Sequence, residues 1–262
     1  MQYQCALITG ATSGLGESFA RQLPQQATLL LTGRNLKKLE ELREELSKNG
    51  RKVEIFPADV ADAEQRKALA EWANGFEVDL FINNAGYGFY GPVLDNSIAN
   101  EEGMTQVNVV ATTYLTRALL SGMVERAHTN HRRAGMIVVA SVAGFMPLPC
   151  FATYAATKAY NLHYTEALAE ELKHLPIDVM ALCPGPTATS FGRTASMGKE
   201  FDTKAASADD VVKLALASLG RKRICVPGLR NSLATCLPRL FPRRLVVWLG
   251  GVTMRRNRPV QG

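Results

Sequence analysis

The sequence predicts an α/β protein built on one doubly wound parallel sheet of about seven strands, with helices on both faces. Short β-rich runs alternate with longer helical stretches, and several runs are almost continuously apolar, as expected for strands that are covered on both faces. A chain of 262 residues is compatible with a single large domain of this class. The strand candidates are Cys5–Ile8, Thr28–Leu31, Val53–Phe56, Leu80–Ile82, Met136–Ala140, Val179–Leu182 and Ile224–Val226.

A glycine-rich turn follows the first strand candidate. It reads Thr9-Gly10-Ala11-Thr12-Ser13-Gly14-Leu15-Gly16 and leads into a helix predicted over Glu17–Leu23. Glycines permit the turn and let the backbone approach a diphosphate, whose charge the helix N-terminus favours. Directly after an N-terminal strand, such a turn indicates a dinucleotide-binding site.

The end of the second strand indicates which nicotinamide dinucleotide is preferred. The segment Thr32-Gly33-Arg34 has no carboxylate to bond the ribose 2′-hydroxyl of NAD, and Arg34 supplies a guanidinium suited to a 2′-phosphate. NADP(H) is therefore favoured over NAD(H), the alternative being that Arg34 is a solvated loop charge. A helix is predicted next, over Leu36–Asn49, because its leucines follow the 3.6-residue period and a glycine ends it.

Polar residues also follow the third and fourth strands. Asp59, in Ala58-Asp59-Val60, could meet the adenine ring, and the backbone of Asn83-Asn84-Ala85-Gly86 could line the cofactor cleft. Both segments are equally compatible with ordinary turns. Asn108 lies in an otherwise apolar helix, where a buried amide needs a partner, and it could hold a water molecule behind Lys158.

The stretch from Ser141 to Lys158 carries the candidate chemistry. Tyr154 and Lys158 lie one helical turn apart on the same face, and Ser141 ends an apolar strand. A neighbouring ammonium stabilises a phenolate and lowers the pKa of the phenol, while a serine can donate a hydrogen bond to a carbonyl oxygen. Together they form a site that moves a proton onto or off an alcohol oxygen. The alternative is an ordinary amphipathic helix.

In this order, the motifs resemble those of the short-chain dehydrogenase/reductase family. The matching motifs cover roughly the first three quarters of the chain: TGATSGLG at 9–16, NNAG at 83–86, Asn108, Ser141 with YAATK at 154–158, and PG at 184–185. The resemblance implies a Rossmann-type catalytic domain over residues 1–227 and a catalytic tetrad of Asn108, Ser141, Tyr154 and Lys158. It also implies that residues from about 190 to 206 cover the substrate. The cofactor-binding residues expected on this basis are Gly10, Thr12, Ser13, Gly14, Leu15, Gly16, Arg34, Asp59, Val60, Asn84, Ala85, Gly86, Tyr154, Lys158, Pro184, Gly185, Thr187 and Thr189.

The implied reaction is hydride transfer between the nicotinamide and a carbonyl or secondary alcohol, with Tyr154 as general acid and base. An apolar set of pocket candidates favours a small lipophilic substrate. A β-ketoacyl-type reductase of lipid metabolism and a non-catalytic NADP(H)-sensing regulator are the alternatives. The resemblance also implies a homodimer or homotetramer, through helices around 103–125 and 150–173. The pocket candidates are Tyr87, Phe89, Val142, Ala143, Phe145, Met146, Phe151 and Phe191.

The C-terminal segment, residues 228–262, is a basic and apolar helical extension. Its second apolar run, Leu245–Leu249, follows Pro242, which suits a helix start, and arginines flank the run. Three interpretations remain open: an arm that packs on its own subunit or a neighbour, a helix in a membrane interface, or a solvated tail. The run is too short to span a bilayer.

Charge and cysteine usage limit the remaining classes of function. The net charge is +6, and no acidic residue follows Asp210. Nucleic-acid binding is disfavoured because the basic residues of the extension alternate with bulky apolar ones. The five cysteines lack metal-binding spacing, so buried free thiols, no metal site and a cytoplasmic location are expected.

Overall fold

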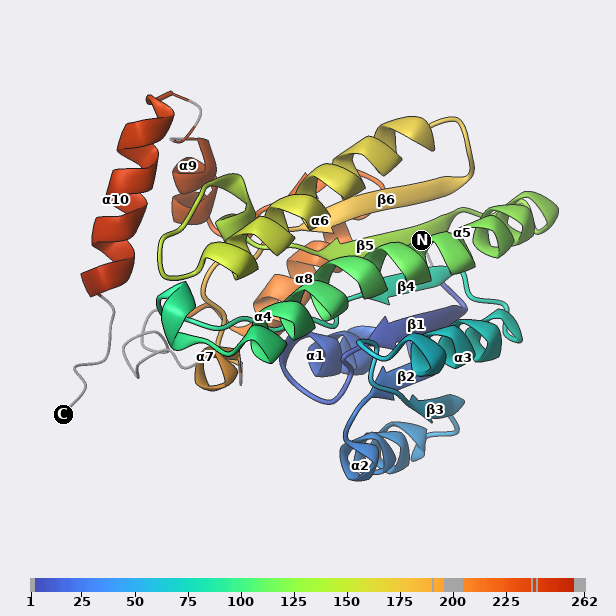
Figure 1. The fold of residues 1–262 in the computed structure, drawn as a ribbon. Coiled ribbons are helices and arrows are strands. Elements are labelled where there is room, and N and C mark those ends of the chain that lie inside the picture. Colours follow the sequence, from blue (N-terminus) through green and yellow to red (C-terminus); the bar gives the residue numbers. More distant parts are fainter. Residues whose placement is uncertain (1–2, 190, 196–204, 237, 239, 257–262) are drawn as a thin grey trace.

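Seven parallel strands form one continuous sheet at the centre of the computed structural model, which describes residues 3–189, 191–195, 205–236, 238 and 240–256. The strand order is β3-β2-β1-β4-β5-β6-β7, and all neighbouring strands pair in parallel (Figure 1). The predicted doubly wound sheet is therefore confirmed. The strands are β1 (Cys5–Thr9), β2 (Thr28–Gly33), β3 (Val53–Pro57), β4 (Leu80–Asn83), β5 (Ala134–Val139), β6 (Ile177–Leu182) and β7 (Ile224–Cys225).

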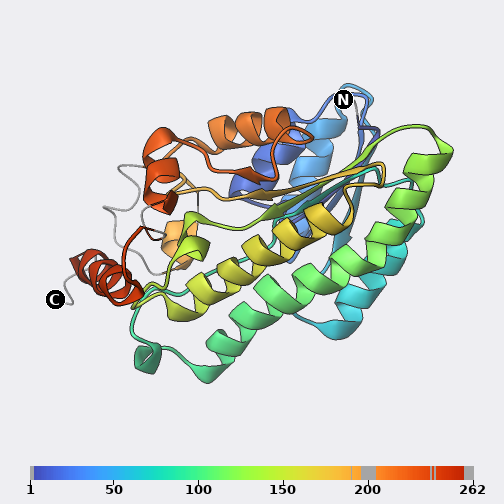
Figure 2. The same cartoon turned by 90° about the horizontal axis from the view of Figure 1, so that it is seen from above.

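Strand β1 shows why the strands read as continuous apolar runs. All five of its residues are buried. Ala6 and Ile8 contribute to the core beneath α1, α2 and α8, whereas Cys5 and Leu7 contribute to the core beneath α3, α5 and α6. Because successive side chains of a strand point to opposite faces, a sheet covered on both sides needs apolar residues at every position. Figure 2 shows the two helical layers.

Ten α-helices are seen in the described part of the chain. Several begin at a side chain that accepts a bond from the first turn, such as Asn35 before α2 and Asp62 before α3. The helices are α1 (Gly14–Gln22), α2 (Leu36–Ser47), α3 (Ala63–Asn74), α4 (Ile98–Thr105), α5 (Thr112–Thr129), α6 (Ala152–Glu171), α7 (Phe191–Thr194), α8 (Ala208–Ser218), α9 (Leu229–Cys236) and α10 (Arg243–Arg256). Shorter elements are the 3-10 helices η1 (Val93–Asp95) and η3 (Val142–Phe145) and the π-helix η2 (Gln106–Ala111).

Some element boundaries differ from those predicted. Helix α1 begins at Gly14 rather than Glu17, because the glycine-rich turn already contributes its first helical residues. Helix α2 ends at Ser47 rather than Asn49, and β5 ends at Val139, so Ser141 lies in the loop just beyond it. These shifts of one to three residues change no strand of the sheet.

Both C-terminal helices lie at the end of the molecule toward which the strands point (Figure 1). Helix α10 begins directly after Pro242, as predicted, and its inner face packs on the loop before α6. A Cβ atom at Gly250 would lie 3.2 Å from the backbone oxygen of Pro147, and one at Gly251 would lie 3.3 Å from the Pro149 ring. The two glycines therefore allow close approach. Within the described residues, no helix is long and apolar enough to cross a membrane.

All five cysteines are free. Cys5, Cys183 and Cys225 are buried as predicted, whereas Cys150 is half-buried and Cys236 is exposed. The prediction of buried thiols is therefore wrong for Cys236, because it lies on α9 outside the sheet core.

Candidate active site

A cavity of about 530 Å³ opens at the carboxyl ends of the strands. Residues from the loops after β1, β2, β3, β4, β5 and β6 line it. Strand β1 pairs with β2 on one side and with β4 on the other, so the connections run in opposite directions from this point. In open parallel sheets, ligands bind at such a switch point.

The glycine-rich turn forms the floor of one end of the cavity. Gly10 and Gly14 have φ angles of +65° and +57°, in the left-handed region that glycine tolerates best. Ser13 precedes α1 without a side-chain hydrogen bond to its first turn, which leaves that helix N-terminus suited to an anion. The lining residues from this turn are Gly10, Thr12, Ser13, Gly14 and Leu15.

Gly16 was expected among the cofactor-binding residues, but it does not line the cavity. A Cβ atom at this position would lie 2.2 Å from the backbone oxygen of Gly10 and 2.7 Å from the Asn84 amide. Gly16 therefore allows α1 to pack closely against the turn and lies behind the residues that line the cavity.

Arg34 and Asp59 face each other at the same end of the cavity. An Arg34 guanidinium nitrogen lies 3.9 Å from an Asp59 carboxylate oxygen, and the arginine side chain is 71% exposed. Thr32, also in the lining, has a buried Oγ1 that lacks a hydrogen-bond partner within the described residues. A cation and an unpartnered hydroxyl at this end fit the polar ribose and phosphate groups of a dinucleotide.

The turn after β4 is tied to the turn after β1. The Asn84 amide donates to the backbone oxygens of Thr9, at 2.8 Å, and Gly10, at 3.2 Å. The backbone nitrogens of Asn84 and Ala85 donate to the Thr9 hydroxyl. As a result, Asn84, Ala85 and Gly86 line the cavity, as expected.

Opposite the glycine-rich turn lies the loop after β6. Thr189 accepts a 3.2 Å bond from the Phe191 nitrogen, and a Cβ atom at Gly14 would lie 2.9 Å from the Thr189 methyl. Pro184, Gly185 and Thr187 of this loop also line the cavity, as expected, and Pro186, which was not expected, lines it too. Most of the segment 190–206, expected to cover the substrate, lies outside the described residues.

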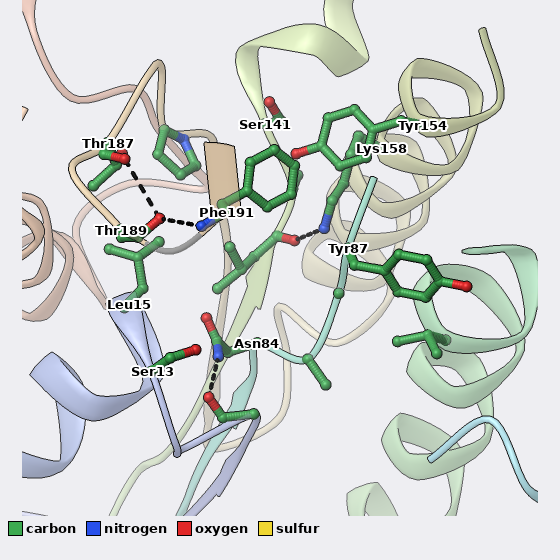
Figure 3. Close-up of a pocket in the computed structure, with 18 of the residues that line it drawn as sticks. Ser13, Leu15, Asn84, Tyr87, Ser141, Tyr154, Lys158, Thr187, Thr189 and Phe191 are labelled. Atoms are coloured by element: carbon green, nitrogen blue, oxygen red, sulfur yellow. Dashed lines mark hydrogen bonds between the residues drawn. The ribbon is translucent and has the colours of Figure 1, made fainter. Parts of the chain in front are cut away.

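Ser141, Tyr154 and Lys158 meet beside this loop (Figure 3). The Ser141 oxygen accepts a 3.1 Å bond from the Ala143 nitrogen, and its hydroxyl lies near enough to the Tyr154 phenol to influence the pKa of that phenol. The Lys158 ammonium donates a 2.8 Å bond to the backbone oxygen of Val139 and lies 5.8 Å from the centre of the Tyr154 ring. Serine and phenol oxygens thus converge on one point, with an ammonium nearby.

Burial sets the protonation of this group. It raises the pKa of Tyr154 to about 12, although the hydrogen bond from Ser141 opposes the rise. This direction is opposite to the expected lowering by Lys158, because loss of hydration is the largest cause and Lys158 is not among the groups that shift the pKa of Tyr154. Burial also lowers the pKa of Lys158 to about 8. At neutral pH the phenol is therefore protonated and the lysine is charged.

The Tyr154 ring is enclosed by aromatic neighbours. Phe151 stacks on it, and the Phe191 ring lies 5.3 Å from it, centre to centre. A Cβ atom at Gly88 would lie 2.7 Å from the Tyr154 ring. The position of the phenol oxygen is therefore fixed by packing as well as by Ser141.

Asn108 lies close to Lys158 but outside the cavity lining. It occupies the π-helix η2 and donates to the Tyr87 backbone oxygen and the Thr157 hydroxyl, while its oxygen accepts from the Tyr87 nitrogen. A Cβ atom at Gly86 would lie 3.0 Å from the Asn108 oxygen and 3.1 Å from the Lys158 nitrogen. Both amide hydrogens are used, so only this oxygen has capacity left for the expected water.

The apolar end of the cavity corrects two sequence-based expectations. Phe89 and Phe145 are not in the lining; Phe145 packs instead beside the core under α6, near Leu162. Met254, which the sequence did not single out, lines the cavity from α10, where nothing local distinguishes it from a surface helix residue. The apolar side chains of this end are Tyr87, Val142, Ala143, Met146, Leu148, Phe151, Phe191 and Met254.

The parallel sheet, the glycine-rich turn and the Ser141, Tyr154 and Lys158 group are the features of a dinucleotide-binding oxidoreductase. The sequence model of the short chain dehydrogenase family matches residues 4–200. The chain therefore belongs to the short-chain dehydrogenase/reductase family.

Known proteins of this family extend the likeness over almost the whole chain. A very-long-chain 3-oxoacyl-CoA reductase-like protein of Arabidopsis thaliana is 31% identical over 261 residues, covering 96% of this chain and 82% of the relative. A solved short-chain dehydrogenase from Sphingobium yanoikuyae in complex with NADPH has a TM-score of 0.79 at 25% identity, covering 99% of this chain and 98% of the other. A 7β-hydroxysteroid dehydrogenase, with a TM-score of 0.83 at 23% identity and coverage of 95% and 97%, shares the fold.

Proposed function

We propose that this protein is an NADP(H)-dependent oxidoreductase that interconverts a lipophilic ketone or aldehyde and the corresponding alcohol. One observation carries the proposal: Ser141, Tyr154 and Lys158 lie together in the wall of a cavity whose other end is the glycine-rich turn. A single cavity thus combines a dinucleotide cradle with an apolar end that holds a proton donor.

The cradle fits a nicotinamide dinucleotide. When bound, the cofactor supplies a hydride to the carbonyl carbon or accepts one from the alcohol. The α1 N-terminus and the backbone of Gly14 would hold the diphosphate, and Asp59 would meet the adenine. Thr189 would contact the carboxamide, and Lys158 would bind the nicotinamide ribose.

Proton transfer falls to Tyr154. In reduction, the neutral phenol donates its proton to the carbonyl oxygen, while the Ser141 hydroxyl donates a second hydrogen bond to the same oxygen. The charged Lys158 stabilises the phenolate that remains. In oxidation the same groups act in reverse, and the phenolate accepts the alcohol proton.

Arg34 supports a preference for NADP(H). Its guanidinium is exposed at the polar end of the cavity, where no carboxylate takes the place expected for an NAD-preferring site. The solved Sphingobium yanoikuyae relative was determined with NADPH. The Asp59 carboxylate lies 3.9 Å from Arg34, so it would offset part of the attraction between the Arg34 guanidinium and a 2′-phosphate.

Reduction of a 3-oxoacyl thioester is the second candidate. The likeness to a very-long-chain 3-oxoacyl-CoA reductase-like protein favours it, and so do the apolar walls at Met146, Leu148 and Met254, which suit an acyl chain. The ketone of such a substrate would take the place of the simple carbonyl at Ser141 and Tyr154.

Binding and turnover together test the proposal. Purified protein is titrated with NADPH and NADH by quenching of intrinsic fluorescence, and NADPH oxidation is then followed with lipophilic ketones and with a 3-oxoacyl-CoA. Tight NADPH binding, turnover of one substrate class and loss of turnover in Tyr154→Phe are expected. Retained turnover in Tyr154→Phe would exclude the assigned role. NADPH binding without turnover of any substrate would favour the alternative of a cofactor-sensing regulator.

A further inference from the structure

The outward face of α10 carries a stripe of large apolar side chains. Leu245, Trp248 and Leu249 are exposed, Trp248 by 59%, and recur at the spacing of one helix face. The opposite face is buried: Val246 and Met254 pack inward, and Met254 reaches the cavity. Helix α10 thus has two apolar faces, of which only one is covered by the protein.

More exposed apolar side chains lie in neighbouring segments at this end. Helix α9 exposes Leu229 and Leu233, and the segment that joins it to α10 exposes Leu240 and Phe241. The short helix η1 exposes Leu94 by 93%. Figures 1 and 2 both place η1, α9 and α10 at the end toward which the strands point. Exposed apolar groups concentrated in one region mark an interaction surface.

The charge of the C-terminal part of the chain, which includes α9 and α10, is one-sided. After Asp210 the chain has eleven Lys or Arg residues and no Asp or Glu, whereas the residues up to Asp210 have 19 Lys or Arg and 24 Asp or Glu. Arg230 lies on α9, and Arg243, Arg244 and Arg255 lie on α10; all four are exposed. Basic groups therefore border the apolar stripe without any acidic residue in the same segment.

The combination of exposed apolar and basic side chains indicates which partner could bind this surface. A second copy of the chain docked face to face would bring two sets of arginines from α9 and α10 together, and η1, α9 and α10 supply only one carboxylate per copy, Asp95 on η1, to pair with them. An anionic lipid surface offers what both groups need: phosphates for the arginines and an interfacial apolar layer for tryptophan and leucine.

We propose that η1, α9 and α10 form a docking surface for anionic lipid membranes. Trp248 and the exposed leucines enter the headgroup boundary, and the arginines contact the lipid phosphates. The proposal does not depend on the reaction. Because the other face of α10 carries Met254, docking would also bring the apolar end of the cavity close to the lipid.

Trp248 provides a direct probe, since the chain has only two tryptophans. The variant Trp72→Phe leaves Trp248 as the sole tryptophan, and Trp248→Phe is its matched control with Trp72 packed between Phe56 and Phe76. Each protein is mixed with vesicles of phosphatidylcholine alone or with about 30 mol % phosphatidylglycerol, at low and at high salt. In Trp72→Phe, emission should shift to shorter wavelength with anionic vesicles at low salt, and the control should show no shift. No shift in Trp72→Phe would overturn the proposal.

Sedimentation with the same vesicles tests which side chains of α10 contribute to membrane binding. Combined Leu245→Ser, Trp248→Ser and Leu249→Ser should abolish binding, and Arg243→Gln with Arg244→Gln should weaken it by about tenfold or more. The control, Leu36→Ser with Leu214→Ser, removes exposed leucines elsewhere and should bind like the wild type. Vesicle binding that does not depend on lipid charge or on salt concentration would contradict the proposal. A lower oligomer mass in the triple serine variant, without vesicle binding by the wild type, would instead identify a second copy as the occupant.

Discussion

The ring of Phe151 stacks on the ring of Tyr154, with the ring centres 4.3 Å apart and the planes inclined by 26°. Phe151 directly precedes α6, and Tyr154 lies in the first turn of that helix. A Cβ atom at Gly88 would come within 3.1 Å of the Phe151 ring as well as 2.7 Å of Tyr154. The Tyr154 ring is thus held between apolar neighbours, with Ser141 as a polar group nearby.

Phe151→Ala should expose the Tyr154 side chain to water. We expect the pKa of Tyr154 to fall from about 12 toward the ordinary tyrosine value, because burial is the main cause of its elevation. The free energy of unfolding should fall by about 3–5 kcal/mol. Ultraviolet titration of Phe151→Ala with and without Tyr154→Phe isolates this one phenol. Phe151→Leu, which keeps most of the apolar volume, should change the pKa less; an unchanged pKa in Phe151→Ala would contradict the explanation by burial.

Gly88→Ala should displace the tyrosine. The new methyl would overlap the Tyr154 ring, so that kcat should drop at least about tenfold and stability by about 1–3 kcal/mol. NADPH affinity should change little, because Gly88 does not line the cavity. The matched control is Gly122→Ala on α5, where the methyl would meet only the movable end of Arg126. Equal kcat in both variants would show that the close approach at Gly88 has no catalytic consequence.

Arg34→Ala should lower the affinity for NADPH more than the affinity for NADH. NADPH should bind about tenfold more weakly, since the exposed guanidinium is partly screened by solvent, while the affinity for NADH should change less than about twofold. Fluorescence titration measures both, and Arg43→Ala on α2 is the control for a lost surface charge. If both affinities fall equally, Arg34 does not bind the 2′-phosphate.

The rate of carbonyl reduction should depend on the ionisation of Lys158. Burial lowers the pKa of Lys158 to about 8, so its positive charge is present below that pH and is lost above it. Because we propose that this charge stabilises the phenolate, kcat/KM for reduction should be level below about pH 8 and should decline above it. Tyr154, with a pKa of about 12, stays protonated throughout. A pH profile measures the decline, and Lys158→Arg should move it to higher pH. A level profile up to about pH 10 would rule out this role.

The sheet and the polar end of the site were readable from local patterns. Apolar runs that alternate with helical periods predict which segments are strands. The glycine-rich turn at residues 10–16 is likewise recognised from adjacent residues alone. The same holds for Tyr154 and Lys158, whose spacing on one helix places them together regardless of the rest of the fold.

The features that the sequence did not reveal depend on contacts between distant segments. The π-helix around Asn108 has no sequence signature, and its amide partners, Tyr87 and Thr157, come from other elements. Met254 reaches the cavity only through the packing of α10 on the loop before α6. The pKa of Tyr154 likewise depends on burial, which the one-turn spacing from Lys158 does not encode.

The contact between Tyr90 and α10 has a consequence for the order in which the site is built. The Tyr90 hydroxyl donates to the backbone oxygen of Met254, a residue 164 positions later in the chain. On the ribosome, the strands that carry the dinucleotide cradle emerge long before α10 does. The nascent chain therefore completes the wall of its substrate cavity last, and a ribosome stalled before α10 would carry a protein with a cofactor cradle and an open substrate side.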